Sequence, residues 1–289
     1  MSSNKLVLGT VQMGLSYGIN NTKGQVSKSE GEKILSLAYN HGVLCLDTAK
    51  AYGESHDVIG SFHDQHPTTK FKVNTKLSEE DVKTGVEGAV KQYIDELRVE
   101  QIDVLMFHSF DQFHSMKSNL EELLNLKEQG KFKKLGVSVY TNEEILQVIS
   151  CPEIDVIQVP FNLLDNHSVK GDLLAKAKVN GKEIHSRSAF LQGLFFKDVN
   201  EDLEIVKALK PYLKVIHSLS KQFGLSVSQL SLQYCLVQDY IDKVIIGVDS
   251  HEQMISNFKS LETDVPREVI DKINEIKVDN LSKLNPSKW

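Results

Sequence analysis

Four side chains suited to acid–base chemistry follow short apolar runs of this sequence. Asp47 and Tyr52 lie in LCLDTAKAYG, Lys76 lies in VNTKL, and His108 lies in LMFHS. A tyrosine with an unperturbed pKa near ~10 is a poor acid at neutral pH, so a nearby ammonium and a polarising imidazole help it to give up a proton. Lys76 and His108 would supply these groups, and Asp47 would keep the ammonium charged and fixed. Such a proton donor suits carbonyl reduction, in which hydride from a cofactor adds to carbon and a proton must reach oxygen.

Each of the four residues also has an ordinary structural explanation when taken alone. Asp47 could cap the next helix, and Tyr52 could be a half-buried packing residue. Lys76 could extend to solvent, and His108 could be a hydrogen-bonded core histidine. Their joint occurrence at the ends of three consecutive predicted strands favours a chemical role.

The elements that must position these residues are short β-rich runs, separated by patterns typical of helices. We predict eight strands, at residues 5–11, 43–49, 71–77, 102–108, 134–140, 156–161, 183–188 and 243–248. A helix is predicted over 27–42, where Ser27 or Ser29 can cap it and His41 and Gly42 end it. A second helix is predicted over 118–131, with Gly130 as its stop.

The alternation of eight strands with helices favours a closed (β/α)8 TIM barrel over an open sheet, and 289 residues lie close to the roughly 250 typical of that fold. No G-x-G-x-x-G motif follows the first strand, which weakens a doubly wound alternative. We therefore expect one α/β domain over residues 1–289. Active sites of such barrels lie at the C-terminal ends of the strands, where the four residues are predicted to be.

Composition excludes several classes of protein. The chain is 40% hydrophobic and 25% charged with a net charge of −6, so a chain-wide basic field for nucleic acid or an anionic membrane is absent. Cys45, Cys151 and Cys235 form no C-x-x-C pair, which favours small buried hydrophobes in a reducing compartment. The opening MSSNKLVLGT lacks a signal-peptide pattern, and no apolar run approaches the roughly 20 residues that span a bilayer. We expect a cytoplasmic protein.

Over nearly its whole length the chain resembles the aldo-keto reductases. The family pattern of Asp, Tyr, Lys and His matches Asp47, Tyr52, Lys76 and His108 in order. LGVSVY resembles the family's GVSN segment, VIQVPFN its Q-x-x-YN strand, RSAFLQGLF its YSPLAxGxL loop, and IIGVDSHEQMISN its late phosphate-binding segment. The resemblance implies a (β/α)8 barrel that binds NADP or NAD in extended form across the strand ends.

The same resemblance implies a set of cofactor-binding residues. Ser138 and Gln158 would hydrogen-bond the nicotinamide amide, and later residues would lie along the phosphates and the adenosine. The expected set is Ser138, Gln158, Arg187, Gly193, Gly247, Asp249, Ser250, Gln253 and Asn257.

Three positions depart from the family pattern. Val139 stands where Asn is common, which removes one amide contact to the nicotinamide. Arg187 replaces the aromatic residue that stacks on the nicotinamide ring, and its guanidinium could stack there or reach an anionic substrate group. Asp249 lies in the loop that usually carries a basic residue for the 2′-phosphate. We expect NADP on family grounds, with NAD as the alternative.

The predicted function is NAD(P)H-dependent reduction of an aldehyde or ketone to an alcohol, with Tyr52 as general acid. The opening GTVQMGLSYGINNTKGQVS and the RSAFLQGLF loop resemble a bacterial branch associated with sugar or surface-polysaccharide metabolism. Their polar residues Gln12, Asn20, Asn21 and Arg187 would suit a hydroxylated or anionic substrate. The expected partner is a small-molecule carbonyl substrate, with no nucleic acid or membrane partner. We expect a monomer or weak homo-oligomer.

Two other classes of protein stay open. A non-catalytic nicotinamide-cofactor-binding regulatory module on the same barrel would keep Ser138, Gln158 and Gln253, but the intact tetrad argues against it. A metal-dependent barrel hydrolase or isomerase would need ligands that converge at the strand ends. The ten histidines show no H-x-H or H-E-x-x-H clustering, so no metal site is predicted.

Overall fold

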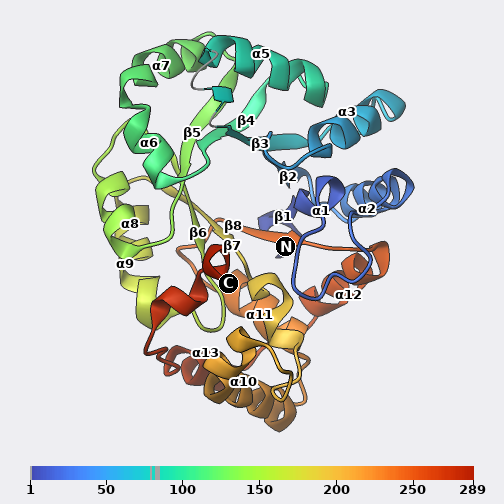
Figure 1. Ribbon diagram of the computed structural model, residues 1–289, viewed down its shortest axis with the longest axis vertical. Helices are drawn as coiled ribbons and strands as arrows, with labels where there is room; N and C mark the ends of the chain where they lie inside the picture. The colour runs from blue at the N-terminus through green and yellow to red at the C-terminus, as the bar shows by residue number, and fades with distance from the viewer. Residues whose placement is uncertain (1, 79, 82–84) are drawn as a thin grey trace.

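The computed structural model describes residues 2–78, 80–81 and 85–289. Within these residues eight parallel strands close into one barrel in chain order, with β8 paired to β1 (Figure 1). The strands are β1 (Leu6–Gly9), β2 (Cys45–Asp47), β3 (Lys72–Leu77), β4 (Ile102–Phe107), β5 (Phe132–Ser138), β6 (Val156–Pro160), β7 (Glu183–Arg187) and β8 (Lys243–Gly247). The predicted (β/α)8 barrel is confirmed. β5 begins two residues before its predicted start because Phe132 pairs with Ile102 of β4.

Helices form a ring around the strands (Figure 1). The α-helices are α1 (Val11–Gly14), α2 (Lys28–Asn40), α3 (Ser55–Gln65), α5 (Val86–Leu97), α6 (Phe110–Ser115), α7 (Leu120–Glu128), α8 (Asn142–Ile149), α9 (His167–Val179), α10 (Glu204–Phe223), α11 (Val227–Leu236), α12 (His251–Leu261) and α13 (Arg267–Asn274). Short 3-10 helices are η1 (Ser2–Lys5), η2 (Lys117–Asn119), η3 (Leu191–Phe196), η4 (Leu281–Leu284) and η5 (Pro286–Lys288). In the described part of the chain, no helix has the length and apolarity needed to cross a membrane.

Both helices predicted in detail are present with shorter bounds. The hydroxyl of Ser27 accepts a hydrogen bond from Glu30 N at 3.3 Å. Of the two predicted cap residues, Ser27 is therefore the N-cap of α2 and Ser29 is not. Gly42 follows that helix with φ +82°, a left-handed conformation that glycine adopts without strain. The second predicted helix is divided into η2 and α7.

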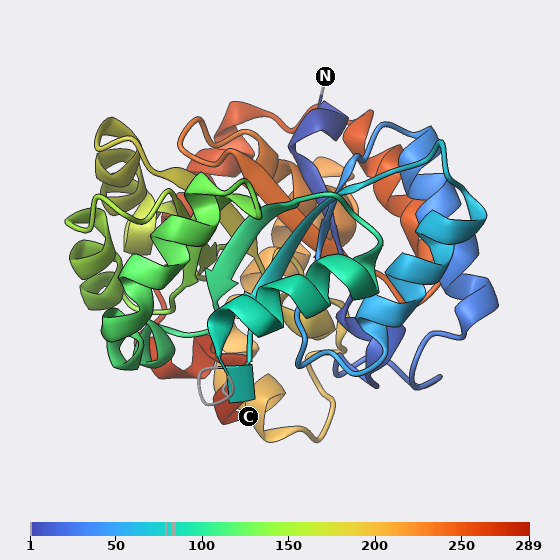
Figure 2. The ribbon, with the colours of Figure 1, turned by 90° about the horizontal axis from the view of Figure 1, so that it is seen from above.

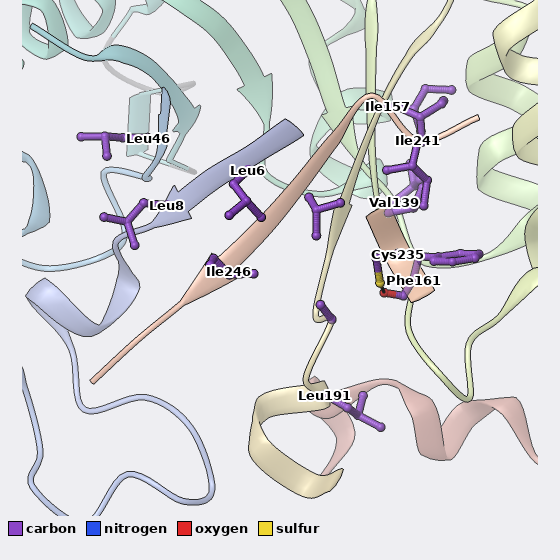
Figure 3. Packing of buried hydrophobic residues seen from close by; sticks show 14 of the residues in the cluster. Leu6, Leu8, Leu46, Val139, Ile157, Phe161, Leu191, Cys235, Ile241 and Ile246 are labelled. Carbon is purple, nitrogen blue, oxygen red and sulfur yellow. Dashed lines mark hydrogen bonds between the residues drawn. The ribbon is translucent and has the colours of Figure 1, made fainter. Parts of the chain in front are cut away.

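The two faces of the barrel strands bury different residues. Leu6, Leu8 and Ile246 belong to the large cluster between strands and helices, and Figure 3 shows them on the adjacent strands β1 and β8. Side chains one residue away along a strand point to the opposite face. Val7 and Ile245 accordingly form a separate small cluster with Cys45 inside the barrel. Cys45 and Cys235 are buried as predicted, whereas Cys151 is partly exposed.

Polar residues replace apolar ones on the inner face at the C-terminal ends of the strands. Asp47 lies two residues beyond Cys45 on β2, Lys76 lies beside Met106 in the β3–β4 register, and Ser138 of β5 pairs with Gln158 of β6. Figure 2 shows the barrel from the side, with the N-terminus and the C-terminal segment at opposite ends. The apolar interior therefore forms the floor of a polar mouth.

Candidate active site

A buried ion pair lies at the centre of the barrel mouth. Lys76 is 2% exposed, and its Nζ donates to Asp47 Oδ1 at 2.5 Å and to the Thr48 carbonyl at 3.0 Å. Gln158 Nε2 donates to the other Asp47 oxygen at 2.7 Å. Burial alone would lower the pKa of Lys76, but Asp47 and Tyr52 together outweigh it and the net pKa is raised. Lys76 is therefore a fixed ammonium at neutral pH.

Tyr52 and His108 lie next to this ammonium. Lys76 Nζ is 5.2 Å from the centroid of the Tyr52 ring, and the Tyr52 and His108 rings pack edge to face with centroids 5.7 Å apart. Gln112 of α6 positions His108, because its Oε1 accepts from the His108 backbone N at 2.6 Å. The barrel thus brings together the four residues predicted from three separate stretches of sequence.

The environment of His108 keeps its imidazole neutral. Burial, followed by the nearby Lys76 ammonium, lowers the pKa of His108 to about 4. A neutral imidazole can donate one N–H hydrogen bond to a substrate oxygen and does not compete for the proton that Tyr52 would supply.

The low pKa of His108 predicts how stability depends on pH. An unfolded histidine takes up a proton near pH ~6.5, whereas folded His108 does so only near pH 4, so the protein is expected to lose stability as pH falls between these values. His108→Gln should lose less stability between pH 7 and pH 5, measured by urea unfolding. His114→Gln, at an exposed site on the nearby helix α6, is the matched control. Equal losses in wild type and His108→Gln would contradict this account.

Close contact between backbones positions Tyr52. A Cβ on Gly14 of α1 would lie 1.7 Å from the Tyr52 carbonyl oxygen, and one on Gly53 would lie 2.5 Å from the Gly14 carbonyl oxygen. Ser55, two residues after Gly53, forms a hydrogen bond with the Thr10 hydroxyl, and the two hydroxyl oxygens are 2.7 Å apart. Sequence reasoning did not select Gly14, and the only signal for it is a glycine within the short helix that follows β1.

A cavity of about 800 Å³ opens around these residues. All the predicted site residues except Ser250 line it, namely Asp47, Tyr52, Lys76, His108, Ser138, Gln158, Arg187, Gly193, Gly247, Asp249, Gln253 and Asn257. Ser250 is the N-cap of α12, where its Oγ accepts from Gln253 N at 3.4 Å. Its hydroxyl is therefore directed at the helix.

Two loops meet over the cavity. Ile19 N donates to the Gln192 carbonyl at 3.1 Å, and Asn20 Nδ2 donates to the Gly193 carbonyl at 2.5 Å. Gln192 Nε2 donates to the hydroxyl of Tyr17 at 2.8 Å. Tyr17 therefore lines the cavity, a position that was not predicted from the sequence.

The cavity suits an elongated polar ligand such as a nicotinamide dinucleotide. It extends from the tetrad along β8 to Asn257 of α12. Gln12 Oε1 is buried and has no hydrogen-bond partner among the described residues, so it is available to a ligand. A Cβ on Gly247 would lie 2.5 Å from the Gln12 amide, so glycine keeps this part of the cavity open. Asn21, by contrast, uses its Oδ1 within its own loop, where it accepts from Gly24 N at 2.9 Å.

Acidic groups surround the N-terminus of α12, where the resemblance to the family places the phosphates. Glu30 of α2 has its Oε1 2.8 Å from both the backbone N and the ring Nδ1 of His251. These hydrogen bonds lower the pKa of Glu30 and keep it ionised. Asp249 lines the cavity, its backbone N donates to Gln253 Oε1 at 2.8 Å, and its carboxylate accepts from Gln253 Nε2 at 3.4 Å. Glu30 was not predicted, because it lies 221 residues from His251 in the sequence.

Comparisons with known proteins agree with the barrel fold. The model described as "Aldo/keto reductase family" matches residues 5–278. An aldo-keto reductase from Bacillus halodurans, solved in its holo form, has a TM-score of 0.76 and 19% identity, with coverage of 95% of this chain and 93% of that one. A putative aldo-keto reductase from Pseudomonas aeruginosa has a TM-score of 0.62 and 20% identity, with coverage of 89% and 88%.

Proposed function

Because the chain belongs to the aldo/keto reductase family, and is thereby an oxidoreductase, we propose that it reduces an aldehyde or ketone to an alcohol with Tyr52 as general acid. The observation that carries this proposal is the buried Lys76–Asp47 ion pair beside Tyr52 and His108. Burying an ammonium costs free energy even when a carboxylate holds it. Its position against the ring of the proposed acid therefore points to a function.

The residues of the chain supply the proton and hold the substrate oxygen. A reduced nicotinamide dinucleotide, when bound in the cavity, would supply the hydride for the carbonyl carbon. The Tyr52 hydroxyl donates its proton to the carbonyl oxygen, and the Lys76 ammonium stabilises the phenolate that remains. Asp47 keeps Lys76 in place, while neutral His108 donates a hydrogen bond to the same oxygen.

The remaining lining residues would hold the cofactor and a polar substrate. Ser138 and Gln158, paired at the ends of β5 and β6, would bind the nicotinamide amide, and the β8 end would hold the phosphates. A hydroxylated, sugar-derived carbonyl compound is the substrate class that fits the wall best, because the polar residues Gln12, Asn20 and Tyr17 line it and Gln12 Oε1 has no partner among the described residues.

A direct assay tests the proposed function. Oxidation of NADPH and NADH should be followed with a panel of aldehydes, keto sugars and nucleotide-linked sugars. Turnover of at least one carbonyl compound is expected. Cofactor binding without turnover of any compound would favour the non-catalytic regulatory module and contradict the reductase.

The cofactor end of the cavity predicts weak discrimination between NADPH and NADH. A 2′-phosphate bears up to two negative charges near neutral pH, and both Asp249 and Glu30 would repel it. Screening over about 8 Å at physiological salt limits this repulsion, so NADPH, which the family favours, should still bind.

Asp249→Arg is expected to tighten NADPH binding by about tenfold, which is the rough contribution of one charge-assisted hydrogen bond. NADH binding should stay nearly unchanged. Fluorescence titration of both cofactors measures the two affinities. Asp264→Arg makes the same charge change at an exposed position outside the cavity and is the control. Equal shifts for both cofactors would mean that Asp249 does not face the ribose.

A further inference from the structure

Arg187 differs from the other two arginines of the chain, because no described residue forms an ion pair with it. Arg98 pairs with Asp64 at 3.1 Å and Arg267 pairs with Asp271 at 3.0 Å, both on the surface. Arg187 is half-buried and lines the cavity, yet among the described residues it forms no ion pair. A half-buried charge without a counter-ion is unfavourable, so a ligand with negative charge would stabilise it.

The side chain of Arg187 extends away from β8. Its guanidinium carbon lies 4.2 Å from the centroid of the Tyr140 ring, and Nη2 is 3.5 Å from the Val139 carbonyl, both just beyond β5. The Phe161 N–H donates to the Arg187 carbonyl at 3.0 Å and holds the backbone at the end of β7. The guanidinium therefore lies beside the end of β5, where the planar Tyr140 ring supports it, and it lines the same cavity as the tetrad.

The other charged groups that act on Arg187 or on the tetrad form two ion pairs, and the Asp165 carboxylate of one pair also attracts Arg187, so the sum of these charges is one positive charge. Lys76 is paired with Asp47, and a second buried lysine, Lys170, is paired with Asp165. After burial and Lys76, the charge of Arg187 also contributes to the low pKa of His108, so the guanidinium acts on the same space as the tetrad. The catalytic end of the cavity thus carries a net positive charge.

The backbone that follows Arg187 is strained. Ser188, Leu191 and Gln192 all have positive φ angles, of 62°, 46° and 53°, a region that residues other than glycine rarely adopt. Such conformations persist where the surrounding structure enforces them, and they cluster at ligand-binding sites. Here they belong to the loop that carries the chain from Arg187 over the cavity.

We propose that Arg187 binds an anionic group of the substrate, so that the preferred substrate is a carbonyl compound with a carboxylate or phosphate ester close to the reacting carbonyl. The guanidinium donates two parallel hydrogen bonds to such an oxyanion. This inference rests on the proposed carbonyl reduction and names the substrate class for that site.

Matched substrate pairs test the inference. Pyruvate is compared with pyruvamide, and glyceraldehyde 3-phosphate with glyceraldehyde, by kcat/KM under identical salt. The wild type is expected to prefer the anionic member of at least one pair by roughly 10- to 100-fold. Arg187→Gln should abolish that preference, and Arg187→Lys should keep part of it, because lysine retains the charge and loses the bidentate geometry.

A surface variant and a binding measurement complete the test. Arg267→Gln removes an exposed arginine with the same loss of charge, and it should retain the wild-type preference. Calorimetric titration with oxalate and with inorganic phosphate should show binding to the wild type and to Arg267→Gln, but at least tenfold weaker binding to Arg187→Gln.

These measurements separate the inference from the proposed function. Equal losses for charged and neutral substrates in Arg187→Gln would overturn it. So would a change in cofactor affinity with an unchanged anion preference, which would assign Arg187 to the cofactor. Binding of anions through Arg187 without turnover of any carbonyl compound would support the anion site and contradict carbonyl reduction.

Discussion

Replacement of Tyr52 by phenylalanine is expected to lower the rate of carbonyl reduction by at least two orders of magnitude, in line with the usual 10²–10⁴-fold contribution of general acid catalysis. The ring would still pack against His108 and over Lys76, so only the hydroxyl group and the proton it carries are lost. Cofactor affinity should stay close to that of the wild type. Steady-state kinetics with any competent substrate, together with cofactor titration, provide the measurement.

The control for this variant is Tyr212→Phe. The Tyr212 hydroxyl bonds Asp279 on the surface, outside the cavity, so its loss should not change the rate. Near-normal turnover by Tyr52→Phe would contradict the proposed mechanism, because no step of the reduction could then depend on the tyrosine proton.

Lys76→Met is expected to remove most of the activity, on the same scale as Tyr52→Phe. The ammonium that stabilises the Tyr52 phenolate would be gone, so the alkaline side of the pH–rate profile should move to higher pH. Stability should also fall, by up to about 3–5 kcal/mol, because Asp47 would be left buried without its charged partner. Kinetics across pH and urea unfolding measure the two effects.

A double variant separates chemistry from folding. Asp47→Asn alone should damage both activity and stability, since it strips Lys76 of its counter-charge. Combined with Lys76→Met it removes the whole ion pair, which should recover part of the stability and none of the activity. An unchanged pH profile in Lys76→Met would show that the ammonium does not act on the tyrosine.

The architecture of the barrel could be predicted from local patterns. Each strand is a short apolar run whose period and flanking residues identify it, and eight such runs alternating with helices leave few other folds. Boundaries were less predictable. β5 gains Phe132 through pairing with β4, and only the structure shows that Ser27 caps α2.

The candidate tetrad was predictable for a geometric reason. The C-terminal ends of parallel strands in a closed barrel all meet at one mouth, so residues at three successive strand ends must lie near one another. Local sequence therefore determined that Asp47, Tyr52, Lys76 and His108 would gather, although their catalytic roles stay predictions that the variants above test.

Contacts between distant segments were decided only by the tertiary structure. Glu30 reaches the N-terminus of α12 across 221 residues of sequence, and Gly14 fits against the Tyr52 carbonyl only because α1 and the turn after β2 pack together. The sequence by itself determined the barrel, the tetrad and the presence of Arg187 at a strand end. Whether Arg187 has a counter-ion depends on which carboxylates lie near it once the barrel is closed. Distances between residues far apart in the sequence cannot be predicted from local patterns.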